Sequence, residues 1–298
     1  MLPAVERPSI AIVGAGRLGT ALAVRLAEVG YSISELVVRA DRNSRKGTSA
    51  RRLARRVGAR VVPLSTAHLT ADLIWFCVPD AEVAKAAAGL ANAAGLANND
   101  WQGKVAFHSS GVLTSDGLAP LRRKGAHVAS VHPLMTFVRG SIPQLVDVPF
   151  SVEGDQPAVR VARNIVCELG GEALILRKKD KVAYHAFATM ICPLLVSLLA
   201  SSEAVAALAG ISRRAARCRM MPIVRQTLEN YLKLGPAESF SGPLVRGDAE
   251  TIRLHLRALR KEAPAKDVYR ALARAALECL PSRNKRELQK LLREPTST

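Results

Sequence analysis

Apolar residues in the first part of the chain fall in short runs that are separated by segments of helical periodicity. The runs predict strands near residues 10–13, 33–38, 61–62, 71–78, 104–107, 129–131, 149–152 and 172–176. Helical segments between the strands are typical of a doubly wound, mostly parallel α/β sheet. From Lys178 the apolar period changes to 3.6, which predicts helices at 179–209, 212–234, 248–262, 266–278 and 282–292. We therefore expect an α/β domain over residues 1–178 and an all-α domain over residues 179–298.

The first strand runs into a glycine-rich turn, G-A-G-R-L-G at residues 14–19, and then into a helical pattern. Gly14 permits a tight turn, Gly16 lets the backbone approach a pyrophosphate, and Gly19 lets the helix pack on the strand. The first-turn N–H groups, at Arg17 and Leu18, would face the phosphates of a dinucleotide. The motif favours a Rossmann domain that binds a dinucleotide over a structural strand–helix turn that binds nothing.

The end of the second strand favours NADP over NAD. Residues 39–60 contain nine basic side chains and a single acid, Asp41. Arginines at this place accommodate a 2′-phosphate, whereas an acid binds the ribose 2′-hydroxyl. Arg39 and Arg42 are the predicted contacts, and Ser44 is a weaker candidate. The arginines that follow have the spacing of the solvated face of the next helix.

The residues after the fourth and fifth strands lie at the edge where open α/β sheets bind ligands. Val78 and Pro79 are predicted walls for the cofactor, or alternatively a simple strand terminator, and Asp80 is placed to cap the next helix. In the segment His108-Ser109-Ser110-Gly111, Ser110 could reach the nicotinamide or a substrate oxygen. Capping of a helix predicted at 114–124 is the other explanation.

Two further polar positions are site candidates. His132 is fixed before a proline at the sheet edge, although a single loop histidine is more often structural. Lys181 and His185 are four residues apart on a helix, hence on one face, with Tyr184 beside them. A lysine and a histidine that face a nicotinamide could bind a carboxylate and exchange a proton with a carbonyl oxygen. A solvated lysine and a core histidine are the alternative.

The helix that carries these residues is unusually apolar. Residues 182–200 contain no Asp, Glu, Lys or Arg over nineteen positions, close to the length of a membrane span. Because the segment contains His185, Pro193 and Ser197 and adjoins a soluble domain, we interpret it as a buried core helix or a subunit interface and expect no membrane span.

Composition narrows the classes of partner. Of 298 residues, 49% are apolar and 23% charged, and the net charge is +18. With 4% aromatic residues and no nucleic-acid-binding motif, an arginine-rich surface explains the charge better than nucleic-acid binding does. The five scattered cysteines lack C-x-x-C spacing, so we expect reduced thiols and no metal site. The N-terminal residues lack a basic and an apolar leader region, so we expect a cytoplasmic protein.

Several segments together resemble a known family of predicted NAD(P)-dependent oxidoreductases, in which a Rossmann-like domain precedes a helical domain of unknown function 2520. They are GAGRLGTALA, VPD, HSSG, SVHPLMTF, DKVAYHA and SGPLVRGDAETIRLHLRAL, and they span about residues 9–260. Wider relatives include pyrroline-5-carboxylate reductase, prephenate dehydrogenase, 6-phosphogluconate dehydrogenase and ketopantoate reductase. The resemblance implies a helical domain that forms a homodimer and a substrate cleft between the domains.

The resemblance also implies roles for single residues. It places Lys181, Tyr184 and His185 in the cleft, and it marks Asn230, the Ser241-Gly242-Pro243 turn, Arg246, Gly247 and Asp248. Arg246 could clamp a carboxylate, while Gly242-Pro243 reads as a turn and Asp248 as a helix N-cap. Many relatives carry an asparagine eight residues after this histidine. This chain has Pro193, which we expect to kink the helix.

These observations predict an NADP-dependent oxidoreductase that transfers a hydride to or from a small polar substrate, most simply a 2-oxo acid of the ketopantoate kind. His185 would be the general acid, Lys181 would assist by charge, Ser110 would lie near the nicotinamide and Arg246 would bind a carboxylate. A deazaflavin or an imine is the other substrate class. Pro193 keeps open a protein that binds NADP as a regulator or scaffold and catalyses nothing.

Overall fold

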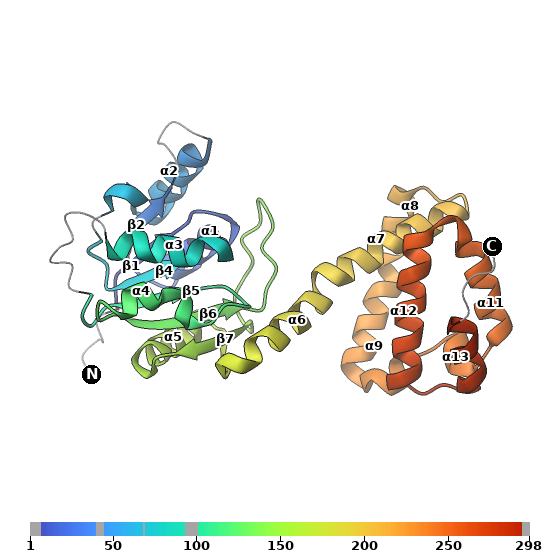
Figure 1. Ribbon diagram of the computed structural model, residues 1–298. Helices are drawn as coiled ribbons and strands as arrows, with labels where there is room; N and C mark the ends of the chain where they lie inside the picture. Colours follow the sequence, from blue (N-terminus) through green and yellow to red (C-terminus); the bar gives the residue numbers. More distant parts are fainter. Residues whose placement is uncertain (1–6, 40–44, 68, 93–100, 294–298) are drawn as a thin grey trace. The chain divides into compact units, whose positions relative to one another are not determined.

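A computed structural model describes residues 7–39, 45–67, 69–92 and 101–293. The chain divides into two compact units, Met1–Thr189 and Met190–Thr298 (Figure 1). The division falls inside helix α6 (Lys181–Ile191), later than the expected boundary at residue 178. The reason is that the first turn of α6 packs on the sheet unit, where the Lys181 side chain is 1% exposed.

The first unit is built on one eight-stranded sheet with the order β3-β2-β1-β4-β5-β6-β7-β8. Strands β6 and β7 pair antiparallel and all other neighbours pair parallel. This confirms the predicted doubly wound, mostly parallel fold, and each predicted strand overlaps an observed one. The strands are β1 (Ile10–Val13), β2 (Ile33–Val38), β3 (Arg60–Pro63), β4 (Leu73–Phe76), β5 (Val105–His108), β6 (His127–Pro133), β7 (Pro149–Gly154) and β8 (Glu172–Ile175).

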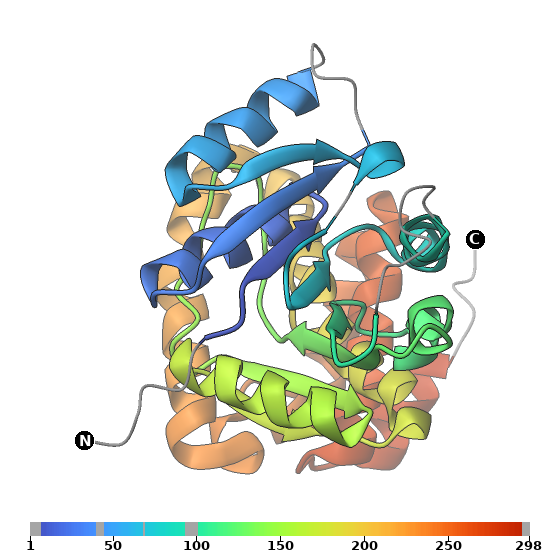
Figure 2. The ribbon, with the colours of Figure 1, turned by 90° about the vertical axis from the view of Figure 1, so that its left-hand side faces the viewer.

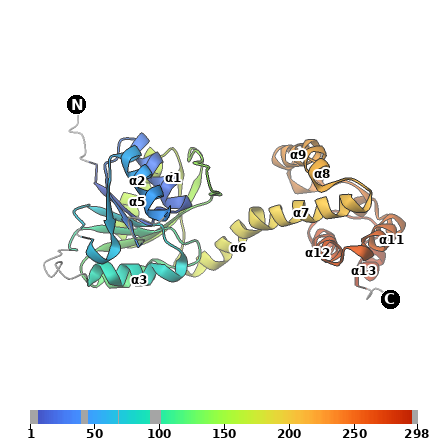
Figure 3. The ribbon, with the colours of Figure 1, turned by 90° about the horizontal axis from the view of Figure 1, so that it is seen from above.

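Helices cover both faces of this sheet (Figure 2). Side chains alternate along β1, so Ile10 and Ile12 join one core cluster while Ala11 and Val13 join the other. The first cluster lies under α1 (Arg17–Glu28), α2 (Arg45–Val57) and α5 (Gln156–Glu168), and the second under α3 (Asp80–Ala91) and α4 (Ala119–Arg122). Figure 3 shows α1, α2 and α5 opposite α3.

Two local predictions in this unit are wrong. The segment 114–124 is not one helix, because a 3₁₀ turn η2 (Ser115–Leu118) precedes the short α4, which has a proline at its start. Asp80 does not cap α3. Pro79 takes the extended N-cap position (φ −56°, ψ 149°), so Asp80 is the first helical residue and its side chain makes no cap hydrogen bond. Its carboxylate instead lies in the first turn, where a negative charge is favoured by the helix dipole.

The second unit is helical, as predicted, with a small core between α11, α12 and α13. Its helices are α7 (Pro193–Leu208), α8 (Arg213–Arg219), α9 (Met221–Ser239), α10 (Pro243–Arg246), α11 (Ala249–Ala258), α12 (Ala263–Cys279) and α13 (Lys285–Arg293), with a 3₁₀ turn η4 (Leu259–Lys261) after α11. The segment predicted as 212–234 is divided at Met220, because Pro222 stands in the first turn of α9.

The predicted kink at Pro193 is confirmed. Cys192 leaves the helical conformation (φ −119°, ψ −83°), and Pro193 then begins α7. By length and composition alone, one helical stretch of the described chain, Lys178–Leu208, could cross a membrane, with mean hydropathy 1.9. A single stretch of this kind is weak evidence for a span, and the break at Cys192 divides it into two shorter helices.

The RGD segment near the end of the family motif has a structural role in the second unit. Asp248 caps α11, because its Oδ1 accepts from the Thr251 N–H at 3.0 Å and its Oδ2 from the Thr251 hydroxyl at 2.7 Å. Gly247 ends α10 with φ +72°, and a Cβ there would lie 2.7 Å from the backbone of Arg283. The predicted N-cap is thus confirmed.

Candidate functional site

The three glycines of the first loop have different surroundings. Gly14 has φ +103°, and a Cβ there would lie 2.7 Å from the carbonyl oxygen of Cys77. A Cβ on Gly19 would lie 1.9 Å from the Gly14 carbonyl oxygen. Gly16 has an ordinary backbone (φ −79°, ψ −161°), and a Cβ there would meet nothing within 4 Å. Loop packing therefore requires Gly14 and Gly19 but does not require a glycine at 16.

The loop leads into the N-terminus of α1, which fits an anionic ligand. Gly16 is the N-cap residue, no side chain caps the helix, and its first turn holds no acid. The first N–H groups of a helix, here including those of Arg17 and Leu18, have no partner within the helix. Val78, after β4, lies against Gly14, and Pro79 beside it is exposed. These residues fit the pyrophosphate of a dinucleotide, which would occupy the open space over Gly16.

Arg39, at the end of β2, reaches across to α3. Its guanidinium forms an ion pair with Glu82 at 2.7 Å, and the side chain is 74% exposed. A 2′-phosphate would therefore share this arginine with a carboxylate. Arg42 and Ser44, the other predicted contacts, lie outside the described residues.

Lys181, at the start of α6, places its ammonium group inside the first unit. Its Nζ donates to the hydroxyl of Ser130 on β6 at 2.7 Å and to the carbonyl oxygen of Ser110 at 3.3 Å. Burial lowers the pKa of Lys181, while the carboxylates of Glu153 and Asp80 oppose that shift. Both hydrogen bonds go to neutral oxygens, so the ammonium ties three chain segments together at the carboxyl edge of the sheet.

The loop after β5 is closed by its own polar groups. The Ser110 hydroxyl accepts from the N–H groups of Val112 and Leu113 at 3.3 and 2.9 Å. His108 accepts from the Ser110 N–H through Nδ1 at 3.1 Å, and its Nε2 lies 2.9 Å from the carbonyl oxygen of Thr114. His108 is thus a neutral ring with its proton on Nε2. The Ser110 hydroxyl holds the loop turn, and its carbonyl oxygen receives Lys181.

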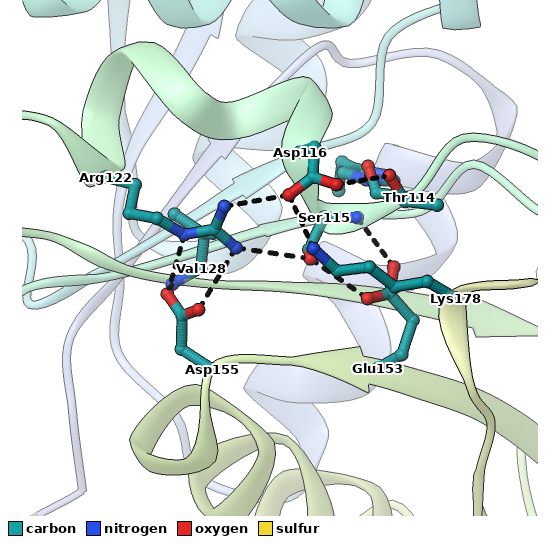
Figure 4. A network of polar contacts seen from close by, with 9 residues as sticks. Thr114, Ser115, Asp116, Arg122, Val128, Glu153, Asp155 and Lys178 are labelled. Atoms are coloured by element: carbon teal, nitrogen blue, oxygen red, sulfur yellow. Dashed lines mark hydrogen bonds and ion pairs between the residues drawn. The ribbon is translucent and has the colours of Figure 1, made fainter.

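A polar network fixes the far end of this loop and the approach to α6 (Figure 4). Buried Glu153 on β7 accepts from both the N–H and the hydroxyl of Ser115, at 2.6 and 2.9 Å. Asp116 in turn accepts from Lys178, in the 3₁₀ turn η3 (Lys178–Asp180) that precedes α6, at 2.5 Å. The network also includes Thr114, Arg122, Val128 and Asp155.

Two imidazoles converge over Gly111. A Cβ on this glycine would lie 2.3 Å from Cδ2 of His185 and 2.9 Å from Nε2 of His132. The ring centroids of His132 and His185 are 5.8 Å apart, and those of His132 and Tyr184 are 6.2 Å apart. The first unit therefore brings Ser110, Lys181, Tyr184 and His185 together with His132.

The remaining sequence candidates lie in the second unit. Arg246 ends α10 with an exposed side chain, and Asn230 on α9 accepts a hydrogen bond from Gln226 at 2.8 Å. Sequence reasoning missed Ser130 and Glu153, which fix Lys181 and the loop after β5. The available signal was a polar residue within an apolar strand segment, since such residues are buried only with partners.

Two domain profiles match the sequence. That of the Rossmann-like domain matches residues 4–133, and that of the domain of unknown function DUF2520 matches residues 148–276. The chain belongs to the family that joins these two domains. The sequence motifs quoted above predict the same family, and the two domain profiles confirm that prediction. No curated protein matches the chain significantly.

Solved structures share the fold over nearly the whole chain. A Bacteroides fragilis protein assigned as an NADP oxidoreductase has a TM-score of 0.73 at 21% identity, over 90% of this chain and 97% of its own. An imine reductase from Pseudomonas sp. has a TM-score of 0.63 at 18% identity, and the match covers 96% of this chain and 99% of the reductase. A reductive aminase from Aspergillus terreus, in complex with NADPH and ethyl-5-oxohexanoate, has a TM-score of 0.65 at 16% identity. This match covers 96% of this chain and 99% of the aminase.

We expect the free energy of unfolding to fall as the pH is lowered from about 6.5 to about 4. Burial is the largest cause that lowers the pKa of His108 and His132 to about 4. An unfolded histidine has a pKa of about 6.5, so the unfolded chain binds more protons in this window. Urea unfolding at about pH 7 and about pH 5 should differ by roughly 1–2 kcal/mol per histidine.

The variant His108→Asn should show a smaller difference between the two pH values, because one of the two contributing groups is absent. Equal stability of the wild-type protein at both pH values would contradict the burial of these neutral rings.

Proposed function

We propose that the protein is an oxidoreductase that binds NADP(H) at the glycine loop and transfers a hydride between it and a small polar substrate. The observation that carries the proposal is the open space at Gly16, where the fold leaves room beside uncapped helix N–H groups. In the proposed complex, Gly14, Gly16, Arg17, Leu18 and Gly19 surround the pyrophosphate. The fold is shared with the Bacteroides fragilis NADP oxidoreductase and with the reductive aminase in complex with NADPH, which supports this proposal.

NADP is the proposed cofactor because of the basic segment that follows β2. Arg39 and Arg42 would bind the 2′-phosphate, and Val78 and Pro79 would line the cofactor at the end of β4. The ion pair with Glu82 brings the Arg39 guanidinium to the first turn of α3, the helix that begins after Pro79.

The proposed chemistry is the reduction of a carbonyl, with a 2-oxo acid as the substrate. NADPH supplies the hydride to the carbonyl carbon, and His185 supplies the proton to the oxygen. The Lys181 ammonium would stabilise negative charge that develops on that oxygen, and Ser110 would lie near the nicotinamide. For Arg246, on the second unit, the family resemblance implies a carboxylate-binding role. The surplus of basic groups supports an anionic substrate.

Imine reduction is the second candidate, and a specific observation favours it. An imine reductase and a reductive aminase share the fold over 96% of this chain. A third candidate is a regulator that binds NADP without catalysis. It is consistent with Pro193, which breaks the helix after His185 at the position where many relatives carry an asparagine.

Replacing Gly16 by valine should weaken NADPH binding without weakening the fold. A Cβ at this position meets no protein atom within 4 Å, and the branched side chain beyond it would occupy the space proposed for the pyrophosphate. We expect the Kd for NADPH, measured by fluorescence titration, to rise at least ~100-fold, which corresponds to ~3 kcal/mol.

The matched control is Gly19→Ala, whose Cβ would clash with the Gly14 carbonyl oxygen, so its melting temperature should fall. A Gly16→Val protein that binds NADPH as tightly as the wild type would count against a dinucleotide at this loop.

Consumption of NADPH, followed by absorbance, should occur with a panel of 2-oxo acids. The His185→Gln variant should lose about 10²-fold or more in kcat, because the proton donor is removed, and retain the wild-type Kd for NADPH. Parallel panels of cyclic imines and of an oxidised deazaflavin decide the substrate class. Tight NADPH binding without turnover of any panel would identify the regulator, and full turnover by His185→Gln would exclude this residue as the acid.

We also propose that the chain forms a homodimer through α7 and α9. These helices expose a set of large apolar side chains: Leu194, Val196, Ile223, Leu228, Tyr231, Leu232 and Leu234. Exposed large apolar side chains in this number favour a surface that another protein covers. A second copy of the chain is the occupant that the family resemblance implies.

Light scattering coupled to gel filtration should give twice the chain mass of 31.9 kDa. A double variant, Ile223→Asp with Leu232→Asp, should shift the protein to the monomer, because Leu232 is 85% exposed in the single chain and would be covered in the dimer. Leu254→Asp on α11 is the control at an exposed leucine outside these helices. A wild-type monomer, or protein recovered only with detergent, would contradict the dimer.

A further inference from the structure

A groove runs between helix α2 and strand β3, at one edge of the first unit (Figure 2). Its volume is about 740 Å³, which lies within the range of ligand-binding clefts. Strand β3 stands at one end of the sheet order, so no described strand pairs with its outer edge. The described residues therefore leave a groove and an unpaired strand edge at the same place.

The walls of the groove come from two regular faces. Side chains alternate along β3, so Val61 packs on the core cluster beneath α2, whereas Val62 packs on the opposite cluster. Pro63 shares the face of Val61, and both residues line the groove. The lining residues of α2 lie on one face of that helix, and small ones such as Ala54 and Gly58 leave room beside the strand. The groove thus follows the length of α2 and has an apolar floor.

The length of the groove fits a short extended segment. From Gly47 to Gly58, which both line the groove, α2 rises about 16 Å at ~1.5 Å per residue. About five residues of a β-strand span the same length. A strand added beside β3 would hydrogen-bond to the unpaired edge and would turn every second side chain toward α2. The shape therefore fits an additional strand better than a compact ligand.

Two arginines determine the charge of the groove. Arg51 and Arg55 are exposed and line the groove, one turn apart on α2. Neither forms an ion pair with a described residue, and Arg51 donates only to the hydroxyl of Thr48, at 3.5 Å. The described lining includes no acidic residue. The surface therefore favours an anionic occupant.

The spacing of these two arginines matches that of a strand. Four residues of helix separate them by about 6 Å along the helix axis. Every second residue of a strand lies about 6.6 Å further along, and its side chain points to the same face. Acidic side chains at alternate positions of an added strand would therefore reach Arg51 and Arg55 together. A guanidinium group binds a carboxylate with two parallel hydrogen bonds, which suits this arrangement.

A second copy of the chain is a poor occupant of this groove. Two copies that join edge to edge at β3 around a two-fold axis would bring the same surface of both chains together. Arg51 and Arg55 of one copy would then face those of the other, and like charges repel. The charge of the groove thus opposes self-pairing and favours a different, acidic chain.

We propose that the groove binds an extended acidic segment of a partner protein, which adds a strand beside β3 and places carboxylates at Arg51 and Arg55. Main-chain hydrogen bonds along β3 supply affinity, and the two guanidinium groups supply selectivity for acidic side chains. None of the lining residues is among the proposed cofactor contacts. The inference therefore does not depend on the proposed hydride transfer.

The probe for this surface is a fluorescently labelled peptide in which glutamate and valine alternate, so that its carboxylates share one face when it is extended. Anisotropy should show saturable binding, and the double variant Arg51→Glu with Arg55→Glu should raise the Kd at least about tenfold. The matched control is Arg52→Glu with Arg56→Glu, which changes the net charge equally at exposed positions outside the groove. Its Kd should stay within about twofold of the wild type.

Amide exchange tests the added strand itself. Exchange in peptides covering residues 59–63 should slow when the probe binds, because β3 then has a strand on both sides. No binding at about 1 mM probe, an equal loss of affinity in the two double variants, or binding without protection of residues 59–63 overturns the inference. Tighter binding of a thymidine oligonucleotide than of the peptide also overturns it and assigns the surface to nucleic acid.

Discussion

The buried ammonium group of Lys181 is the interaction on which the candidate site depends. Burying a charge without a counterion in contact costs several kcal/mol unless hydrogen bonds compensate it. Here the carbonyl oxygen of Ser110 and the hydroxyl of Ser130 provide them, and the Ser130 hydroxyl also donates to the same carbonyl at 3.2 Å. This small network joins the loop after β5, the middle of β6 and the first turn of α6.

The position of His185 follows from this network. His185 is one helical turn beyond Lys181 on the same face of α6, so fixing Lys181 also fixes the direction of the imidazole. The loop that supplies Ser110 continues to Gly111, where His185 and His132 meet. The charged group therefore acts mainly by position, and its field favours an oxygen that becomes negative beside it.

Much of the fold could be predicted from the sequence, because buried parallel strands are short apolar runs and the glycine loop marks where the first of them ends. The kink at Pro193 was also predictable, since proline lacks the N–H that continues a helix. The exact residues at which some helices begin were not predictable from the sequence. Pro79 took the N-cap position expected for Asp80, and the segment after Thr114 became a 3₁₀ turn and a short helix.

The sequence indicated some residues of the candidate site, among them Ser110, Lys181 and His185, but not how they are held. The sequence pattern predicts an exposed side chain for a lysine at the start of a helix. Lys181 is nevertheless buried, and its hydrogen-bond partners, Ser130 and Ser110, are 51 and 71 residues away in the sequence. Arg39 pairs with Glu82, which is 43 residues away, and the periodicity of the sequence does not predict a contact over that separation. The contrast between Gly14 and Gly16 also depends on the folded chain, because packing requires a glycine at position 14 while position 16 faces open space.

The most direct test of the central role of Lys181 is amide hydrogen exchange in the variant Lys181→Met, whose unbranched side chain is one atom shorter and lacks the charge and its hydrogen bonds. We expect peptides covering residues 109–115 to exchange at least about tenfold faster than in the wild type, equivalent to ~1.4 kcal/mol of local stability. The strands β1 and β4, remote from this contact, should keep their protection. Unchanged exchange in residues 109–115 would contradict the role of Lys181, because the loop would then hold its shape without the buried ammonium.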